Sequence, residues 1–277
     1  MLRISAHLEA LDEVFTVEWE SAMTALRLKV FLWILFVFMG ATAFAKGRAL
    51  VVISELDHRG VKELSVLYRQ LETLAWKIPQ ESLLLSQTYQ SMHHLKNQKA
   101  TAQGSIDFIA QLIKKKSVEV VDVVLAVHGL PGKLAFYDQT VSVSDWAQAL
   151  KEGVKREGHP LGLGEETSKL GLLYNLSCYG ESHIPSFLDA GFKVAIGSRK
   201  VNANSELEYP WVLHSLAMGR TVASSFHRPN SSDWLQLADG PIVWLGKKQD
   251  SFLKDTDSYK VIGGQSNYRI RKPLWRP

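Results

Sequence analysis

Short apolar runs alternate with amphipathic segments through most of the chain. Uninterrupted apolar runs of this length are typical of strands buried on both faces of a sheet, whereas apolar residues spaced three or four apart indicate helices. The first pattern predicts strands over residues 49–54, 83–89, 118–127, 170–176, 192–196 and 242–245. The second pattern predicts helices over residues 61–75, 106–113, 144–154, 182–190 and 206–218. Residues 133–137 and 140–143 flank a polar turn and predict a small hairpin.

This alternation of strands and helices predicts the fold class. We expect an α/β fold, a three-layer sandwich with a mostly parallel central sheet of about six strands. The sequence contains no internal repeat and no linker long enough to divide it. We therefore expect one α/β domain over residues 46–248, followed by an irregular C-terminal tail over residues 249–277.

The densest apolar run lies near the N-terminus and has the pattern of an export signal. Residues 30–38 read VFLWILFVF, with Arg27 and Lys29 before them and a small-x-small site at Ala43 to Ala45 after them. This arrangement predicts a bacterial-style secretory signal peptide that begins at Met23 and is cleaved after Ala45, so residues 1–45 are absent from the mature protein. We expect an exported protein, periplasmic or extracellular. The alternative is a membrane-anchored protein that keeps an uncleaved signal.

Composition and charge exclude several classes of protein. Of the 277 residues, 46% are hydrophobic and 22% are charged, which excludes disorder and a coiled coil. The net charge of +4 is too small to indicate a nucleic-acid partner. The single cysteine, Cys178, has no partner for a disulfide within the chain. Because export exposes a protein to an oxidising compartment, an unpaired thiol there suggests a chemical role.

Two predicted strands end in residues that carry chemistry. The strand at 118–127 runs into His128-Gly129, and the strand at 170–176 runs into Ser177-Cys178, 50 residues later. In open α/β sheets ligands bind beyond the carboxyl ends of the strands, so neighbouring parallel strands place both pairs at one edge. A thiol reacts as thiolate and needs a base. The backbone N–H groups of Gly129 and Cys178 could hold an oxyanion there.

At these residues the sequence resembles a known superfamily. The segments Leu125-Ala126-Val127-His128-Gly129 and Tyr174-Asn175-Leu176-Ser177-Cys178 are similar to motifs of the caspase-like cysteine peptidases, which include caspases, metacaspases, gingipains, legumains, separases and CHAT-type proteases. The resemblance implies a caspase-like fold and a secreted cysteine endopeptidase. In that enzyme His128 is the general acid and base, Cys178 the nucleophile and Gly129 an oxyanion donor. The Gln-Ala-Cys-Arg-Gly signature of true caspases is absent, so the resemblance does not extend to their preference for Asp.

The resemblance also indicates which residues contact the substrate and whether a cofactor is needed. Residues 191–204 are similar to the strand and loop that shape specificity in that superfamily. Polar residues after strand ends at the proposed edge are candidate contacts for a protein or peptide substrate: Glu181, Ser198, Arg199, Glu206 and Glu208. The chemistry requires no metal or organic cofactor, and the remaining histidines lack the spacing of metal ligands. His93 and His94, for example, are adjacent and point to different sides of a helix.

Two other functions remain open. The first is a catalytically inactive protein of the same fold that serves as a binding module. The second is an α/β-hydrolase-like esterase, because VLAVHGLPG also resembles the oxyanion loop of those enzymes. That fold needs small residues two positions before and after its nucleophile, and Leu176 stands two positions before Cys178.

Overall fold

The structure is a computed structural model, and it describes residues 47–60, 62–156 and 169–271. These residues lie within one compact unit of the chain. The expected signal peptide, with its start at Met23 and its cleavage site after Ala45, lies outside the described residues.

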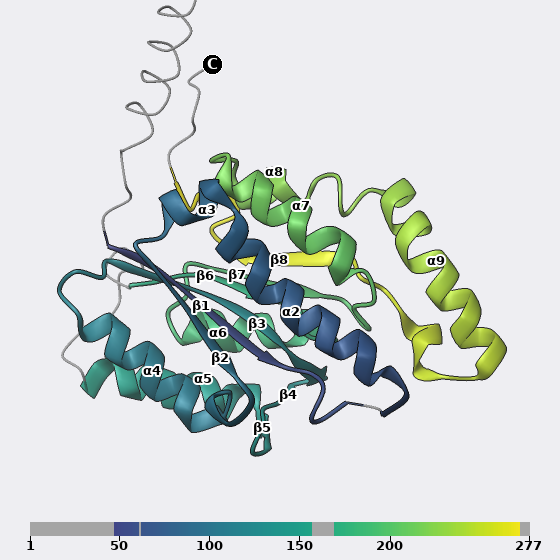
Figure 1. The fold of residues 1–277 in the computed structure, drawn as a ribbon, viewed down its shortest axis with the longest axis horizontal. Coiled ribbons are helices and arrows are strands. Elements are labelled where there is room, and N and C mark those ends of the chain that lie inside the picture. Colours follow the sequence, from purple (N-terminus) through teal and green to yellow (C-terminus); the bar gives the residue numbers. More distant parts are fainter. Residues whose placement is uncertain (1–46, 61, 157–168, 272–277) are drawn as a thin grey trace, which may run out of the picture. The chain divides into compact units, whose positions relative to one another are not determined.

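A single twisted sheet forms the centre of the unit (Figure 1). Its strands follow the order β2-β1-β3-β6-β7-β8. Neighbours from β2 to β7 are parallel, whereas β8 pairs with β7 in the antiparallel direction. The bounds are β1 Arg48–Glu55, β2 Ser91–Lys96, β3 Val120–Leu130, β6 Leu170–Asn175, β7 Val194–Ser198 and β8 Lys260–Gly264. The predicted α/β fold with a mostly parallel sheet is confirmed.

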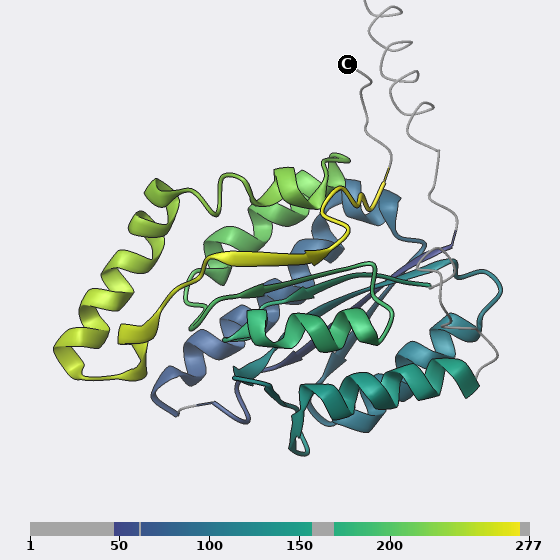
Figure 2. The same ribbon diagram turned by 180° about the vertical axis from the view of Figure 1, so that it is seen from behind.

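Helices cover both faces of the sheet, as the two opposite views in Figures 1 and 2 show. Successive side chains of β3 point to opposite faces of the sheet and so enter two different hydrophobic cores. Val123 and Leu125 belong to the first core, and Val124 and Ala126 belong to the second. On the first face lie α4 Ala102–Lys114, α5 Val143–Arg156 and α6 Ile184–Asp189. On the second face lie α2 Ser65–Glu81, α3 Leu83–Thr88, α7 Ser205–Ala217 and α8 Val222–Phe226.

Short elements complete the chain. The predicted hairpin is confirmed as β4 Lys133–Ala135 and β5 Thr140–Ser142, which extends from the end of β3. Helix α9 Ser232–Gln249 packs against the 3-10 turn η5 Phe252–Asp255. Further 3-10 turns among the described residues are η1 Lys62–Leu64, η2 Asn97–Lys99 and η4 Gly180–His183. None of the helices in the described part of the chain has the length and apolarity to cross a membrane.

The predicted strand at 83–89 is wrong, because these residues form helix α3. The Ser82 side chain accepts a hydrogen bond from the Leu85 N–H at 3.3 Å, which caps the helix and favours it over an extended chain. The strand follows at β2, whose side chains are mostly half-buried because it lies at the sheet edge. His93 and His94 therefore lie on a strand and not on a helix.

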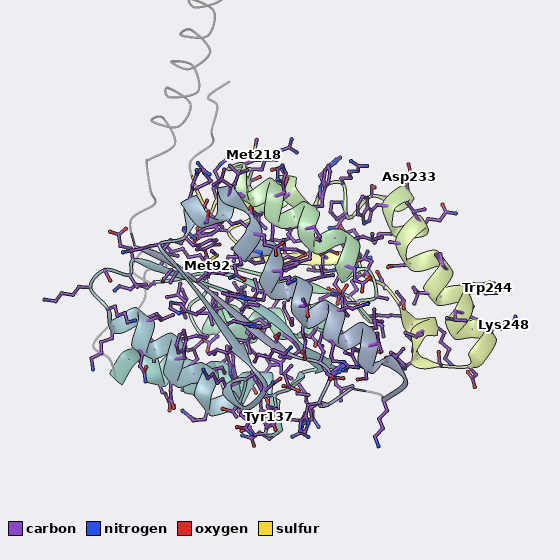
Figure 3. The ribbon with its side chains drawn as sticks, in the orientation of Figure 1. Met92, Tyr137, Met218, Asp233, Trp244 and Lys248 are labelled. Carbon is purple, nitrogen blue, oxygen red and sulfur yellow. The ribbon has the colours of Figure 1, made fainter. Side chains whose placement is uncertain are left out.

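The expected last strand at 242–245 is also wrong, because these residues lie within α9 (Figure 3). The figure shows Trp244 and Lys248 on the outward part of this helix, where Lys248 lies over the Trp244 ring. The last strand is β8, inside the segment expected to be an irregular tail. The fold continues to Ile270, which is buried in the second core, so the domain does not end at residue 248. With two glycines among five residues, β8 lacks the apolar run that marks the other strands.

Candidate active site

The two strands that carry the candidate residues are neighbours in the sheet. Strands β3 and β6 pair in parallel, with Leu125 opposite Asn175. His128 and Gly129 follow on β3, and Ser177 and Cys178 follow β6, at the same carboxyl-end edge. The expectation that neighbouring parallel strands bring these two segments to one edge is confirmed.

Gly129 lies directly against the segment that contains the cysteine. A Cβ atom at this position would approach the Cys178 carbonyl oxygen to 2.3 Å and the Ser177 Oγ to 2.7 Å. Both separations are below any ordinary van der Waals contact, so the backbones approach this closely only because residue 129 has no side chain. The contact places the residue after His128 against the backbone of Cys178.

The His128 ring is held from the side of β1 and α2. Its Nε2 lies 2.8 Å from the Leu56 carbonyl oxygen, and the ring meets the Tyr68 ring edge-on at 4.8 Å between centroids. A carbonyl oxygen only accepts, so Nε2 carries the proton and Nδ1 of the neutral ring has the free lone pair. Burial lowers the pKa of His128, against an opposing effect from the Leu56 carbonyl and the Glu72 carboxylate.

Glu72 on α2 holds the segment that contacts His128. Its Oε1 accepts hydrogen bonds from the N–H groups of Leu56 at 2.7 Å and Asp57 at 3.1 Å. Its Oε2 forms an ion pair with Lys96 Nζ at 3.0 Å. The carboxylate is buried, so these contacts compensate it for lost hydration and keep the Leu56 peptide in place.

Asn175 and His183 shape the turn that presents the cysteine. Asn175 Oδ1 accepts from the N–H of Ser177 at 3.0 Å and from its Oγ at 2.6 Å. Asn175 Nδ2 donates to His183 Nδ1 at 2.9 Å, and His183 Nε2 donates to the Leu130 carbonyl at 2.8 Å. These bonds tie the end of β6 to the end of β3. Neither residue was predicted as a site residue from the sequence, although the side chain of an Asn at a strand end often accepts a hydrogen bond from the N–H group two residues later.

The chain turns sharply after the cysteine. Tyr179 has a φ of 55°, in the left-handed region, and its N–H donates to the Lys200 carbonyl at 2.7 Å. Gly180 then packs on Gly197 so closely that a Cβ at Gly180 would lie 2.7 Å from the Gly197 Cα. The turn therefore packs against the end of β7.

The Cys178 thiol lies in a half-buried position. Its Sγ accepts a hydrogen bond from the Asn202 N–H at 3.4 Å. Burial raises the pKa of the thiol, while the Asn202 N–H and the positive charge of Lys260 act in the opposite direction. A thiol with a raised pKa is mostly protonated at neutral pH, so reaction with an electrophile requires a base to remove the proton.

The five expected substrate contacts lie in two kinds of environment. Glu181, Arg199 and Glu206 are exposed, and the Arg199 guanidinium lies over the Tyr259 ring at 4.1 Å. Ser198 is buried, and its Oγ donates to the Ser177 carbonyl at 3.1 Å. Glu208 is buried as well and binds Lys260 and the Tyr174 hydroxyl. Of the five predicted contacts, three are therefore exposed and two are buried.

Metal ligands are not grouped in the part of the chain that the structure describes. Among residues 47–60, 62–156 and 169–271, no three His, Cys, Asp or Glu side chains are arranged to hold a metal ion.

Comparison with known proteins found similarity among solved structures. No family model matches the sequence, and no curated protein matches it. The chain is similar to the crystal structure of caspase-1 from Spodoptera frugiperda, with a TM-score of 0.44 and 12% sequence identity. The alignment covers 83% of this chain and 92% of that one. Any functional conclusion about this chain therefore depends on its own residues.

Proposed function

We propose that this protein is a caspase-like cysteine endopeptidase in which Cys178 is the nucleophile and His128 the general base. The observation that carries the proposal is the contact of Gly129 with Ser177 and Cys178 at the ends of two adjacent parallel strands. This contact brings the only thiol of the chain to the strand end that carries the imidazole. Because burial raises the pKa of the thiol, a base must generate the thiolate, and the proposal assigns this role to the imidazole at the end of the adjacent strand.

The proposed reaction is acyl transfer through a thioester. His128 Nδ1 accepts the proton of the Cys178 thiol, and Sγ attacks the carbonyl carbon of the scissile peptide bond. The N–H groups of Gly129 and Cys178 donate to the oxyanion that develops on the carbonyl oxygen. The imidazolium then protonates the leaving amine as the C–N bond breaks. Water, deprotonated by His128, hydrolyses the thioester and releases the carboxylic acid and the thiol.

Substrate contacts in this proposal come from residues beside the cysteine turn. Glu181 follows Cys178 by three residues and Arg199 follows β7, and both side chains are exposed. Glu206 is exposed at the start of α7. We propose that these three residues contact a protein or peptide substrate.

An esterase of the α/β-hydrolase type is less compatible with the geometry of the turn. In those enzymes the nucleophile itself occupies the strained position of a strand-to-helix turn. Here the left-handed residue is Tyr179, one position after the cysteine. We therefore keep the peptidase as the proposal.

A covalent-labelling experiment tests the peptidase. The full chain is treated with a peptidyl acyloxymethyl ketone, and the Cys178→Ala and His128→Ala variants are treated in parallel. We expect labelling of the original chain only at Cys178, and a labelling rate lower by about 100-fold or more in His128→Ala. His214→Ala, which changes an exposed histidine, is the matched control and should label at the original rate.

Two outcomes of this experiment contradict the proposal. Equal labelling of the original chain and of His128→Ala excludes the dyad. A folded chain that neither labels nor cleaves a mixed peptide library is the inactive binding protein.

We also propose that the protein is exported, on the basis of the segment from Arg27 to Ala45. N-terminal sequencing of the protein recovered from periplasm or medium should begin at Lys46. A chain that stays in the membrane and keeps the segment is instead anchored by it.

A further inference from the structure

A buried ion pair lies behind the turn that carries Cys178. Lys260 Nζ is 2.5 Å from Glu208 Oε2, and both residues are only 1% exposed. Lys260 comes from β8, opposite Ser198 of β7, and Glu208 comes from α7. The Tyr174 hydroxyl donates to the other oxygen of Glu208. A lysine side chain is rarely buried in this way unless it is paired, so its position is defined by these contacts.

Asn202 connects this ion pair to the thiol. Its Oδ1 accepts from Lys260 Nζ at 3.0 Å, and its Nδ2 donates to the Leu176 carbonyl at 2.8 Å. Its backbone N–H donates to Cys178 Sγ at 3.4 Å. The side chain of Asn202 is thus held at both ends, which fixes the direction of the N–H that meets the sulfur.

Charged and neutral titratable groups near the sulfur come from several elements. Lys260 on β8 supplies a positive charge, and Glu208 on α7 lies behind it and partly neutralises it. His128 belongs to the adjacent β3 end, and Tyr179 follows the cysteine in the chain. Because the interior screens charge poorly, a buried ammonium group favours an anion close to it.

We propose that Lys260 is a positioning residue for Cys178: it orients Asn202 towards the sulfur and stabilises the thiolate. The inference deepens the proposed function, since it takes Cys178 to be the nucleophile. Glu208 limits the effect of Lys260, because its negative charge opposes that of the ammonium group. The two residues therefore act on the thiol in opposite directions.

Alkylation of the thiol tests this proposal without any substrate. The chain has one cysteine, so the reaction of the full protein with iodoacetamide reports Cys178 alone. The alkylation rate is measured from pH 6 to pH 10, and the midpoint of its rise gives the apparent pKa of the thiol. Two variants are compared with the original chain, Glu208→Gln and the double variant Lys260→Met/Glu208→Leu. The double variant removes both charges together and so leaves no uncompensated charge in the interior.

We expect the midpoint of the alkylation curve to move in opposite directions in the two variants. In Glu208→Gln the positive charge of Lys260 is no longer opposed, so the midpoint moves to lower pH. In Lys260→Met/Glu208→Leu the positive charge is lost, so the midpoint moves to higher pH and alkylation at pH 7 slows. The control variant Lys151→Met/Asp189→Leu removes an ion pair between α5 and α6 that has an exposed Asp189, and should keep the original midpoint.

An unchanged midpoint in the double variant overturns the proposal, and so do shifts of both variants in the same direction. Glu208→Gln preserves the side-chain volume, so an unchanged midpoint in this variant overturns the proposal even where the double variant fails to fold. Failure of the peptidase proposal gives a different result. A chain without peptidase activity can still show the opposite shifts, and an active chain without these shifts contradicts only the role of Lys260.

Discussion

The imidazole of His128 and the backbone of Leu56 are joined by a hydrogen bond of 2.8 Å between Nε2 and the carbonyl oxygen. The Leu56 N–H donates in turn to the buried Glu72 carboxylate at 2.7 Å. The orientation of the proposed base therefore depends on a helix, α2, that does not contain it.

Replacing Glu72 by Gln should lower the pKa of His128. The negative charge of the Glu72 carboxylate raises the pKa of His128, whereas burial lowers it. Loss of the charge therefore leaves the effect of burial dominant and lowers the pKa further. The acidic limb of the labelling rate plotted against pH should move to lower pH, and so should the NMR titration of the His128 ring. Glu81→Gln changes an exposed carboxylate at the end of the same helix and should leave both curves in place. An unmoved limb in Glu72→Gln contradicts the electrostatic link.

Gly129→Ala should disturb both stability and labelling. The new methyl group would meet the Cys178 carbonyl oxygen at 2.3 Å, so one of the two strand ends must shift. We expect a loss of about 1–3 kcal/mol in the free energy of unfolding and a slower labelling of Cys178. Gly240→Ala is the control, since a Cβ there meets nothing within 4 Å and Ala favours the helix. Denaturant unfolding measures the free energy of unfolding of the two variants. If Gly129→Ala and Gly240→Ala are equally stable, the close contact at Gly129 is contradicted.

The buried His183 should make the protein less stable in acid. Burial lowers the pKa of His183, so the folded state keeps the ring neutral, with Nδ1 accepting from Asn175. The unfolded chain binds a proton below a pH of about 6.5, so stability is full above this value and falls as the pH decreases further. The melting temperature should therefore fall between pH 7 and pH 5.

His183→Gln should reduce this dependence on pH and lower the melting temperature at pH 7. Some dependence of the melting temperature on pH should remain, because burial also lowers the pKa values of His93, His94 and His128. His214→Gln, at an exposed position, should keep the original slope. If the slopes of the two variants are equal, His183 does not contribute to it.

The opposite end of the sheet should matter for stability but not for labelling. Asp122 near the start of β3 forms a buried ion pair with Arg48. It also accepts from the Leu172 N–H at 2.7 Å and from the Tyr89 hydroxyl at 3.0 Å. Asp122→Ala leaves the guanidinium unpaired and should reduce the free energy of unfolding by about 3–5 kcal/mol.

The control for this prediction is Asp189→Ala, which breaks the ion pair that the exposed Asp189 forms with Lys151 and should change stability by about 0–1 kcal/mol. Chemical denaturation gives both values. The labelling rate of the folded Asp122→Ala protein should equal that of the original chain. A slower rate would show that the two ends of β3 are coupled.

The part of the fold that local pattern determines was predictable from the sequence. The runs at 118–127 and 170–176 form β3 and β6, because a strand buried on both faces needs apolar side chains at successive positions. The elements missed are those with a weaker pattern. Residues 83–89 are apolar enough for a strand, but the Ser82 cap starts a helix there. Strand β8 contains the buried Lys260, a residue type that indicates a surface position when only the sequence is known.

The sequence by itself determined that a His-Gly pair and a Ser-Cys pair follow two buried strands, because apolar run length is a local property of the chain. The tertiary structure decided which polar groups support them. Leu56 reaches His128 across 72 residues, and Lys260 reaches Asn202 across 58. These partners depend on which strand lies next to which in the order β2-β1-β3-β6-β7-β8, and that order follows from packing of the whole chain. The sequence around a polar residue does not specify its hydrogen-bond partner, because the partner depends on which segments of the folded chain pack against that residue.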